Sequence, residues 1–187
     1  MLTVMKSLIQ PRLDYCSQLW SPRDQATINR LEKVQMQFVS RIKDSSLENL
    51  NYWEKLSELK LYSQERRRER AMICFIWKMS QGLIEGYDLK WSFSDRRGRQ
   101  VVPNIVRRSA AAKVRSAREK SLGVHGARIS NLLPQSVRDE DSGDYILFKN
   151  RLDIFLSQVP DQPTKAGLAR AAASNSLLDQ IPLLEVN

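Results

Sequence analysis

Cysteine, histidine and long apolar runs are scarce in this chain of 187 residues. Two cysteines, Cys16 and Cys74, are too few for a disulfide framework or a zinc site. A Ser-His-Asp triad would have to use His125, the single histidine. The longest apolar run, seven residues from Ala71 to Trp77, is far shorter than the roughly 20 residues of a membrane-spanning helix. We therefore expect an intracellular protein, cytoplasmic or nuclear, with no metal, cofactor, small-molecule substrate or membrane partner.

Acidic residues are also in deficit, because 21 Asp and Glu face 30 Lys and Arg and leave a net charge of +9. Nearly all of this excess lies in residues 96–120, where nine basic residues face the single acid Glu119. That segment carries +8, and the rest of the chain nets +1. Such a segment attracts polyanions, nucleic acid first. The residues that we predict to contact nucleic acid are Arg96, Arg97, Arg99, Arg107, Arg108, Lys113, Arg115 and Arg118.

The same basic segment also fits a second interpretation, a solvated and flexible connector. Trp91 and Phe93 precede it, and aromatic rings beside arginines suit stacking on single-stranded bases. Aromatic residues in such positions are also common in protein cores, so both interpretations stay open. A smaller basic cluster, Arg66 to Arg70, is spread around a full helical turn and cannot face one ligand as a whole.

Apolar spacing predicts a mainly α-helical protein, with a bundle of about four helices in residues 1–82. Ser21 with Asp24 and Asn51 with Glu54 are expected to start helices, Ser63 is expected to cap another, and Gly82 is expected to end it. Pro11 should kink the first helix or restart it.

The rest of the chain divides into three parts. Residues 83–120 read as a basic connector, partly extended, in which Val101-Val102 and Ile105-Val106 are either short strands or extended chain. Residues 121–158 read as a small C-terminal helical unit packed on or beside the bundle. Residues 159–187 are rich in Ala, Ser, Gln and Pro and read as a disordered tail.

Six segments resemble, in order and spacing, the region that follows the catalytic core in jockey-type, LINE-like non-LTR retrotransposon reverse transcriptases. They begin with the run from Lys6 to Tyr15, which is followed by Leu19-Trp-Ser-Pro22. The others are Ile28–Gln35, Tyr52–Leu61 with Glu65–Arg68, Arg96–Arg99 with Val101–Pro103, Leu122–Pro134 and Phe148–Leu156. The resemblance covers residues 3–160 and implies the thumb and post-thumb region of an RNA-directed DNA polymerase.

The sequence departs from that family in one respect that decides its chemistry. The family's polymerase holds two metal ions with a pair of adjacent aspartates, and this sequence has no Asp-Asp pair. Asp139-Glu140-Asp141 is its nearest acidic cluster, and no apolar strand flanks it. At position 130, where the family often has Trp, this chain has Ser130. The resemblance therefore places fingers and palm before residue 1, and we expect no enzymatic activity, including DNA synthesis, from these residues.

Two functions remain open at the level of sequence. The first is nonspecific binding to the backbone of RNA or an RNA/DNA hybrid, as a thumb grips a duplex. Arg30, Lys33 and Arg41 on the expected helices could contribute to that grip. The alternative is a helical protein-interaction module, or a decayed gene product without a selected function. Because phosphate contacts weaken with salt, a steep salt dependence of RNA binding separates the two.

Overall fold

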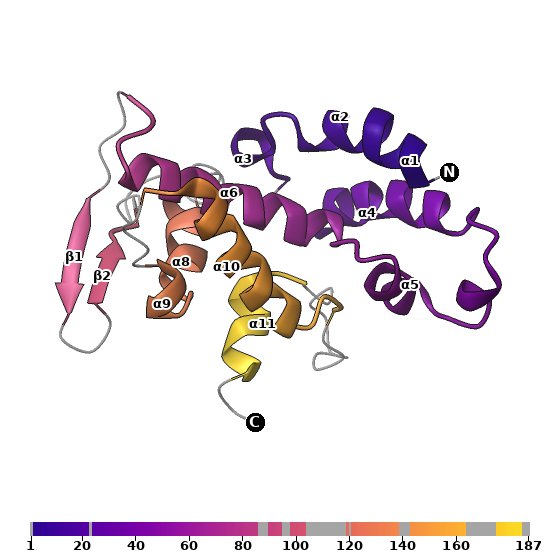
Figure 1. Cartoon of the computed structure of the whole chain (residues 1–187). Coiled ribbons are helices and arrows are strands. Elements are labelled where there is room, and N and C mark those ends of the chain that lie inside the picture. The colour runs from indigo at the N-terminus through magenta and orange to yellow at the C-terminus, as the bar shows by residue number, and fades with distance from the viewer. Residues whose placement is uncertain are drawn as a thin grey trace.

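A computed structural model describes residues 2–22, 24–85, 90–94, 98–103, 119, 121–138, 143–163 and 175–184. This part of the protein is mainly helical, as the sequence predicts (Figure 1). Up to the central helix the elements are α1 (Leu2–Val4), η1 (Met5–Ile9), α2 (Gln10–Asp14), α3 (Ser17–Trp20), α4 (Gln25–Val39), η2 (Ser45–Leu47), α5 (Tyr52–Glu58) and α6 (Gln64–Ser80). They are followed by β1 (Trp91–Ser94), β2 (Gly98–Val101), η3 (Leu122–Gly126), α8 (Ala127–Asn131), α9 (Gln135–Arg138), α10 (Tyr145–Gln158) and α11 (Leu177–Leu184).

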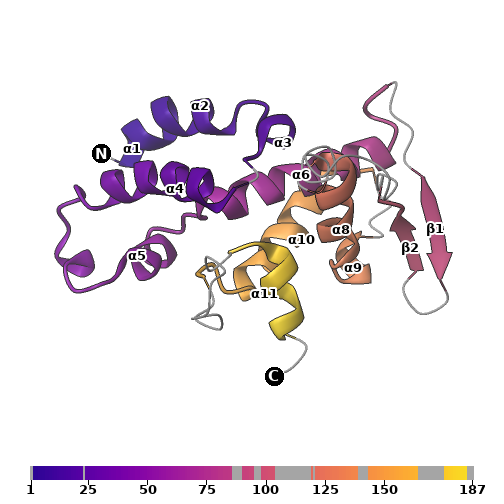
Figure 2. The ribbon, with the colours of Figure 1, turned by 180° about the vertical axis from the view of Figure 1, so that it is seen from behind.

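Helix α6 lies at the centre of the fold. Helices α1, α2, α4 and α5 lie toward its N-terminal end, and α8 and α9 lie toward its C-terminal half (Figures 1 and 2). Helix α10 runs along α6, with Tyr145 beside Trp77 and Asp153 paired with Arg70, and α11 begins beside its first half, where the Leu177 N–H donates to Glu69. The main apolar cluster joins the second half of α6 to the later elements, with Met72, Phe148 and Leu152 almost fully buried. Trp77 stacks on Phe148 with 4.8 Å between ring centroids. Residues 121–158 thus pack directly on a helix that the sequence assigned to the N-terminal bundle.

Local signals place several helix ends correctly. Asn51 and Glu54 form a complete capping box at the start of α5. The Ser63 hydroxyl accepts a hydrogen bond from the Arg66 backbone N–H and caps α6. Gly82 follows α6 with φ of +68°, a conformation that glycine adopts without steric cost.

The first twenty residues differ in detail from a pair of regular helices. The chain before Pro11 is π-helical over Met5–Ile9, and α2 follows directly, with Pro11 in its first turn. Cys16 then adopts a left-handed conformation and separates α2 from the short α3. Trp20, at the end of α3, is 41% exposed.

Helix α4 begins later than the sequence suggests. The capping residue is Asp24, whose side chain accepts from the Thr27 N–H at 2.8 Å and from the Thr27 hydroxyl at 3.0 Å. Ser21 precedes it outside the helix, so the expectation of a Ser21 cap with Asp24 as the third helical residue is wrong. Asp24 offers the stronger acceptor, because an ionised carboxylate makes charge-assisted bonds to the N-terminal donors.

A hairpin, formed by β1 and β2, is the described part of the predicted connector. The strands are antiparallel, with Trp91 opposite Val101 and Ser94 opposite Gly98. The side chain of Asn131 in α8 accepts from the Val101 N–H and donates to the Val101 carbonyl, at 2.9 and 2.8 Å. Val101 is thus part of a strand, one of the two possibilities left open, while Ile105-Val106 lies outside the described residues.

The expectation of a disordered tail does not hold for residues 175–184. These residues end in helix α11, and Leu177 and Ile181 are 0% and 4% exposed in the main apolar cluster. The segment before α11, residues 159–163, is also described and contacts α6. Burial of these side chains supplies the stabilisation that composition alone did not suggest.

Candidate nucleic-acid interface

Most of the predicted contact residues lie outside the described part of the chain. These are Arg96, Arg97, Arg107, Arg108, Lys113, Arg115 and Arg118. Arg99 is described only in its backbone, which pairs with Phe93 in the hairpin. The hairpin is held to α8 by the two hydrogen bonds of Asn131, so the basic segment begins on an anchored element.

Exposed cations in and just after α4 occupy positions where a ligand could reach them. Arg30 and Lys33 lie in α4, Arg41 lies in the turn after it, and all three are exposed. The apolar residues of α4 are unevenly buried, since Ile28 and Val39 are buried whereas Val34 is 38% exposed. Glu32 and Gln35 are buried in its place.

The reason for this shift is a polar contact between α4, α5 and α6. Glu32 accepts from the Gln64 N–H at 2.8 Å and from the Tyr52 hydroxyl, so a carboxylate lies at the N-terminus of α6. Burial raises the pKa of Glu32 above its ordinary value, although both hydrogen bonds act against this. Gln35 donates to the Tyr62 carbonyl at 3.0 Å.

The side chains of the second basic cluster, Arg66 to Arg70, lie in the protein interior or at its edge. Arg66 is fully buried, with Nη2 donating to the Pro160 carbonyl at 2.8 Å and Nη1 donating to the Val159 carbonyl at 3.4 Å. Its Nε lies 3.9 Å from Asp161. Arg70 forms a bidentate pair with Asp153, at 2.6 Å for both bonds. These arginines are engaged by the protein itself, which removes them as an alternative nucleic-acid surface.

Arg68 is buried without comparable compensation. It is 2% exposed, and neither Nη atom has a hydrogen-bond partner among the described residues. Burial lowers the pKa of Arg68, although the charges of Glu65, Glu32 and Glu69 act in the opposite direction. A lowered pKa means that the folded protein holds the charged guanidinium less favourably than water does.

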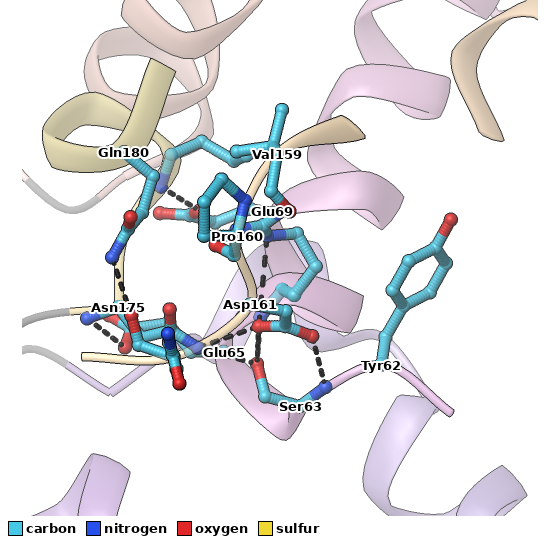
Figure 3. A network of polar contacts seen from close by, with 12 residues as sticks. Tyr62, Ser63, Glu65, Glu69, Val159, Pro160, Asp161, Asn175 and Gln180 are labelled. Atoms are coloured by element: carbon cyan, nitrogen blue, oxygen red, sulfur yellow. Dashed lines mark hydrogen bonds and ion pairs between the residues drawn. The ribbon is translucent and has the colours of Figure 1, made fainter. Parts of the chain in front are cut away.

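Asp161 joins the first turn of α6 to the segment that precedes α11 (Figure 3). It accepts from the Ser63 N–H and hydroxyl, both at 2.7 Å, and from the Asn175 side-chain amide at 2.6 Å. Asn175 N–H in turn donates to Glu65 at 3.2 Å. Hydrogen-bonding groups at the start of α6 thereby find partners about a hundred positions away in sequence. No local sequence signal indicates these contacts.

A parallel set of contacts surrounds Glu69 one turn later. Its carboxylate accepts from the Leu177 N–H at 2.7 Å and from the Ser176 hydroxyl at 2.6 Å. His125 Nε2 lies 2.7 Å from the same carboxylate. Serine and histidine both contact the acid, whereas a catalytic relay needs the histidine between serine and acid. His125 therefore tethers η3 to α6 and α11.

A cleft of about 520 Å³ lies between the N-terminal helices, α6 and the turn that follows α5. Met5, Leu61, Tyr62 and Ala71 supply apolar surface, and Gln10 adds an amide. The charged residues of the cleft are Lys6, Lys60, Arg67, Arg70 and Asp14. Asp14 is bound by Arg67, with Nη2–Oδ2 at 2.5 Å, and by Gln10 at 2.9 Å. Among the described residues, no carboxylate pairs with Lys6 or Lys60.

Lys60 has an unusual backbone for a lysine. It closes α5 at φ of +51°, with its own N–H bonded to the Ser57 carbonyl and the Leu61 N–H bonded to the Leu56 carbonyl at 2.8 Å. This is a Schellman motif, in which glycine is the usual residue. A non-glycine residue in the left-handed region costs about 1–2 kcal/mol. Sequence analysis missed Lys6 and Lys60, because neither lies in a basic run.

Two further findings concern the chemistry available. None of the described helices is long and apolar enough to cross a membrane. Within the described ranges, histidine, cysteine and acidic residues form no group of three or more arranged to bind a metal ion.

Comparison with known proteins adds no assignment. No protein-family model, no curated protein and no solved structure matches this chain.

Proposed function

We propose that this chain binds the phosphate backbone of RNA or of an RNA/DNA hybrid without reading base sequence, and that it has no polymerase activity of its own. The observation that carries the proposal is the segregation of charge, +8 within residues 96–120 against +1 elsewhere. Long-range attraction to a polyanion is therefore centred on one segment. The proposal agrees with the resemblance to the thumb and post-thumb region of non-LTR reverse transcriptases.

The surroundings of the basic segment support this assignment. Arg66 and Arg70 are taken up by internal contacts, so they do not compete with it for a ligand. Arg30 and Lys33 on α4 and Arg41 in the turn after it remain exposed and supply a secondary set of phosphate contacts. Such contacts position a strand but carry no sequence information.

A salt series with single-stranded RNA tests the proposal. If about five basic side chains bind phosphates, log K should fall against log salt with a slope of roughly −3 to −4. Replacement of Arg96, Arg97, Arg99, Arg107 and Arg108 by Ala should flatten that slope and weaken binding equally for different base sequences. Replacement of Arg30, Lys33 and Arg41 by Ala is the comparison variant, which measures how much these secondary contacts contribute to the slope.

Equal slopes for the wild type and the five-fold variant would refute the role of residues 96–120. Circular dichroism must show unchanged helix content in both variants. Primer extension with Mg²⁺ or Mn²⁺ should yield no product, and a dNTP-dependent and metal-dependent product would contradict the non-catalytic assignment.

A second candidate function, docking of a protein partner, is favoured by exposed apolar side chains on the N-terminal helices. Leu8, Tyr15 and Leu19 are 62%, 76% and 74% exposed. Apolar groups clustered at a surface are typical of protein-protein contacts. Binding through these residues would persist at high salt, whereas phosphate binding would be lost.

A further inference from the structure

We propose that the cleft bounded by Lys6, Lys60 and Arg67 binds one nucleotide unit, with its phosphate at the cationic rim and its base or sugar against the apolar wall. The proposal rests on the proposed function for the nature of the ligand, a nucleic-acid strand or a component of one. The cleft is a different site from residues 96–120, and the charge of that segment gives no evidence about it.

The charges of the cleft favour an anion. Its single lining carboxylate, Asp14, is already paired with Arg67 and bonded to Gln10. Arg70 is paired with Asp153. Lys6 and Lys60 are therefore the lining charges that a bound anion would neutralise, and a phosphate has the oxygens to contact both.

The size and the wall of the cleft indicate more than a bare phosphate ion. Ligand sites are typically 300–1,000 Å³, and this cleft, at about 520 Å³, lies within that range. Met5, Leu61 and Ala71 offer an apolar surface, and the ring of Tyr62 can face a base. Burial, together with the charge of Asp153, raises the pKa of Tyr62 to about 12, so its phenol stays neutral beside a phosphate.

The backbone conformation of Lys60 supports the cleft as a ligand site independently of its charge and size. Glycine would close α5 with less strain, yet the chain has a lysine there, and that lysine lines the cleft. Strained backbone of this kind is found disproportionately at binding sites, where the side chain has a use that offsets its cost. A requirement for a positive charge at this point of the cleft would explain both why a lysine is tolerated in the left-handed conformation and why its side chain lines the cleft.

Lys60→Gly gives a test in which stability and binding change in opposite directions. Removal of the strain should raise Tm by about 2–4 °C, while loss of one charge about 4 Å from a phosphate should weaken binding about fivefold. Lys6→Ala should weaken binding to a similar extent. Lys43→Ala, a change at an exposed lysine that does not line the cleft, is the control and should bind as the wild type does.

The probes are adenosine 5′-monophosphate, adenosine, inorganic phosphate and an RNA 12-mer without terminal phosphates, each titrated by calorimetry. We expect the monophosphate to bind at least tenfold more tightly than adenosine or inorganic phosphate. Binding of the 12-mer with the same loss in Lys60→Gly would show that an internal phosphodiester is accepted. Preference for the monophosphate alone would assign the site to a free or terminal phosphate.

Several outcomes overturn the proposal. These are no monophosphate binding at millimolar concentration, equal binding of inorganic phosphate, and Lys60→Gly binding as tightly as the wild type. The five-fold arginine variant of residues 96–120 should still bind the monophosphate normally. Its behaviour with long RNA tests the proposed function, so failure of the cleft and failure of the basic segment give different results.

Discussion

Two buried arginines on one helix, Arg66 and Arg68, should respond in opposite ways to the same substitution. Methionine has similar length and no charge, so Arg66→Met and Arg68→Met each remove a guanidinium and leave little empty volume. The two positions are 0% and 2% exposed, which makes their burial equivalent. The difference between them lies in their hydrogen bonds.

Arg66→Met removes the donor to the Pro160 carbonyl at 2.8 Å and the weaker donor to the Val159 carbonyl at 3.4 Å. It also leaves Asp161 without its cationic neighbour. A hydrogen bond from a charged group is worth about 1.5–3 kcal/mol, and breaking a buried pair from one side is costlier still. We expect a loss of about 2–4 kcal/mol in the free energy of unfolding.

Arg68→Met removes no hydrogen bond that either Nη atom makes within the described part of the chain, because neither has a partner there. Its lowered pKa shows that burial outweighs the attraction of the nearby carboxylates. Since the charged form is held less favourably in the fold than in the unfolded chain, its removal should leave stability unchanged or raise it by up to about 1 kcal/mol.

Urea unfolding at pH 7, followed by circular dichroism, measures both changes. The midpoint should fall for Arg66→Met and stay or rise for Arg68→Met, with a constant m value in both. Equal destabilisation by the two substitutions would refute the reasoning, because it would show that the charge itself, and not its hydrogen bonds, stabilises this helix.

Three further predictions concern other parts of the fold. Asn51→Ala, which breaks the capping box with Glu54, should lower the free energy of unfolding in urea by about 1 kcal/mol. Asn51→Asp should retain most of that stabilisation, because aspartate also caps well. Glu32 has a raised pKa in the fold, so its contribution to stability is present in full below its unfolded pKa and is lost as pH rises through the folded value. Glu32→Gln should therefore flatten the pH dependence of Tm above about pH 4.5. Gly126→Ala would bring a methyl within 2.9 Å of Ile76 Cδ1 and should lower stability by about 1–2 kcal/mol, measured by thermal unfolding.

Signals that act over a few residues could be predicted from sequence with good accuracy. The Asn51 cap, the Ser63 cap and the stop at Gly82 depend only on neighbours within one helical turn. The mainly helical character follows from the same local spacing. Ser21 was a wrong choice of cap because α4 starts at Gln25, so Asp24 is the residue whose side chain accepts from the first-turn N–H of Thr27.

Contacts over long sequence distances could not be predicted in this way. Leu177 and Ile181 stand in a polar, alanine-rich region of sequence, and their burial depends on a surface formed by α6, α8 and neighbouring elements. Lys60 gave no signal because its importance lies in the φ angle of one residue. Residues 96–120 remain a prediction from charge alone, since most of their basic side chains lie outside the described chain.

The charged first half of α6 shows why a run of arginines in a sequence does not by itself identify a nucleic-acid surface. Its charges have partners in segments that follow it by many tens of residues: Arg70 pairs with Asp153, Arg66 lies beside Asp161, and Glu69 binds Leu177. A chain that ended at residue 158 would lack the Val159 and Pro160 carbonyls that accept from Arg66 and the Asp161 carboxylate that accepts from Ser63. Residues 159–163 and 175–184 are therefore part of the unit that makes α6 stable as a buried helix. Because Arg66 and Arg70 of α6 are used inside the fold, a ligand must find its positive charge elsewhere, and the proposed sites are residues 96–120, the exposed cations in and just after α4, and the cleft at Lys6 and Lys60.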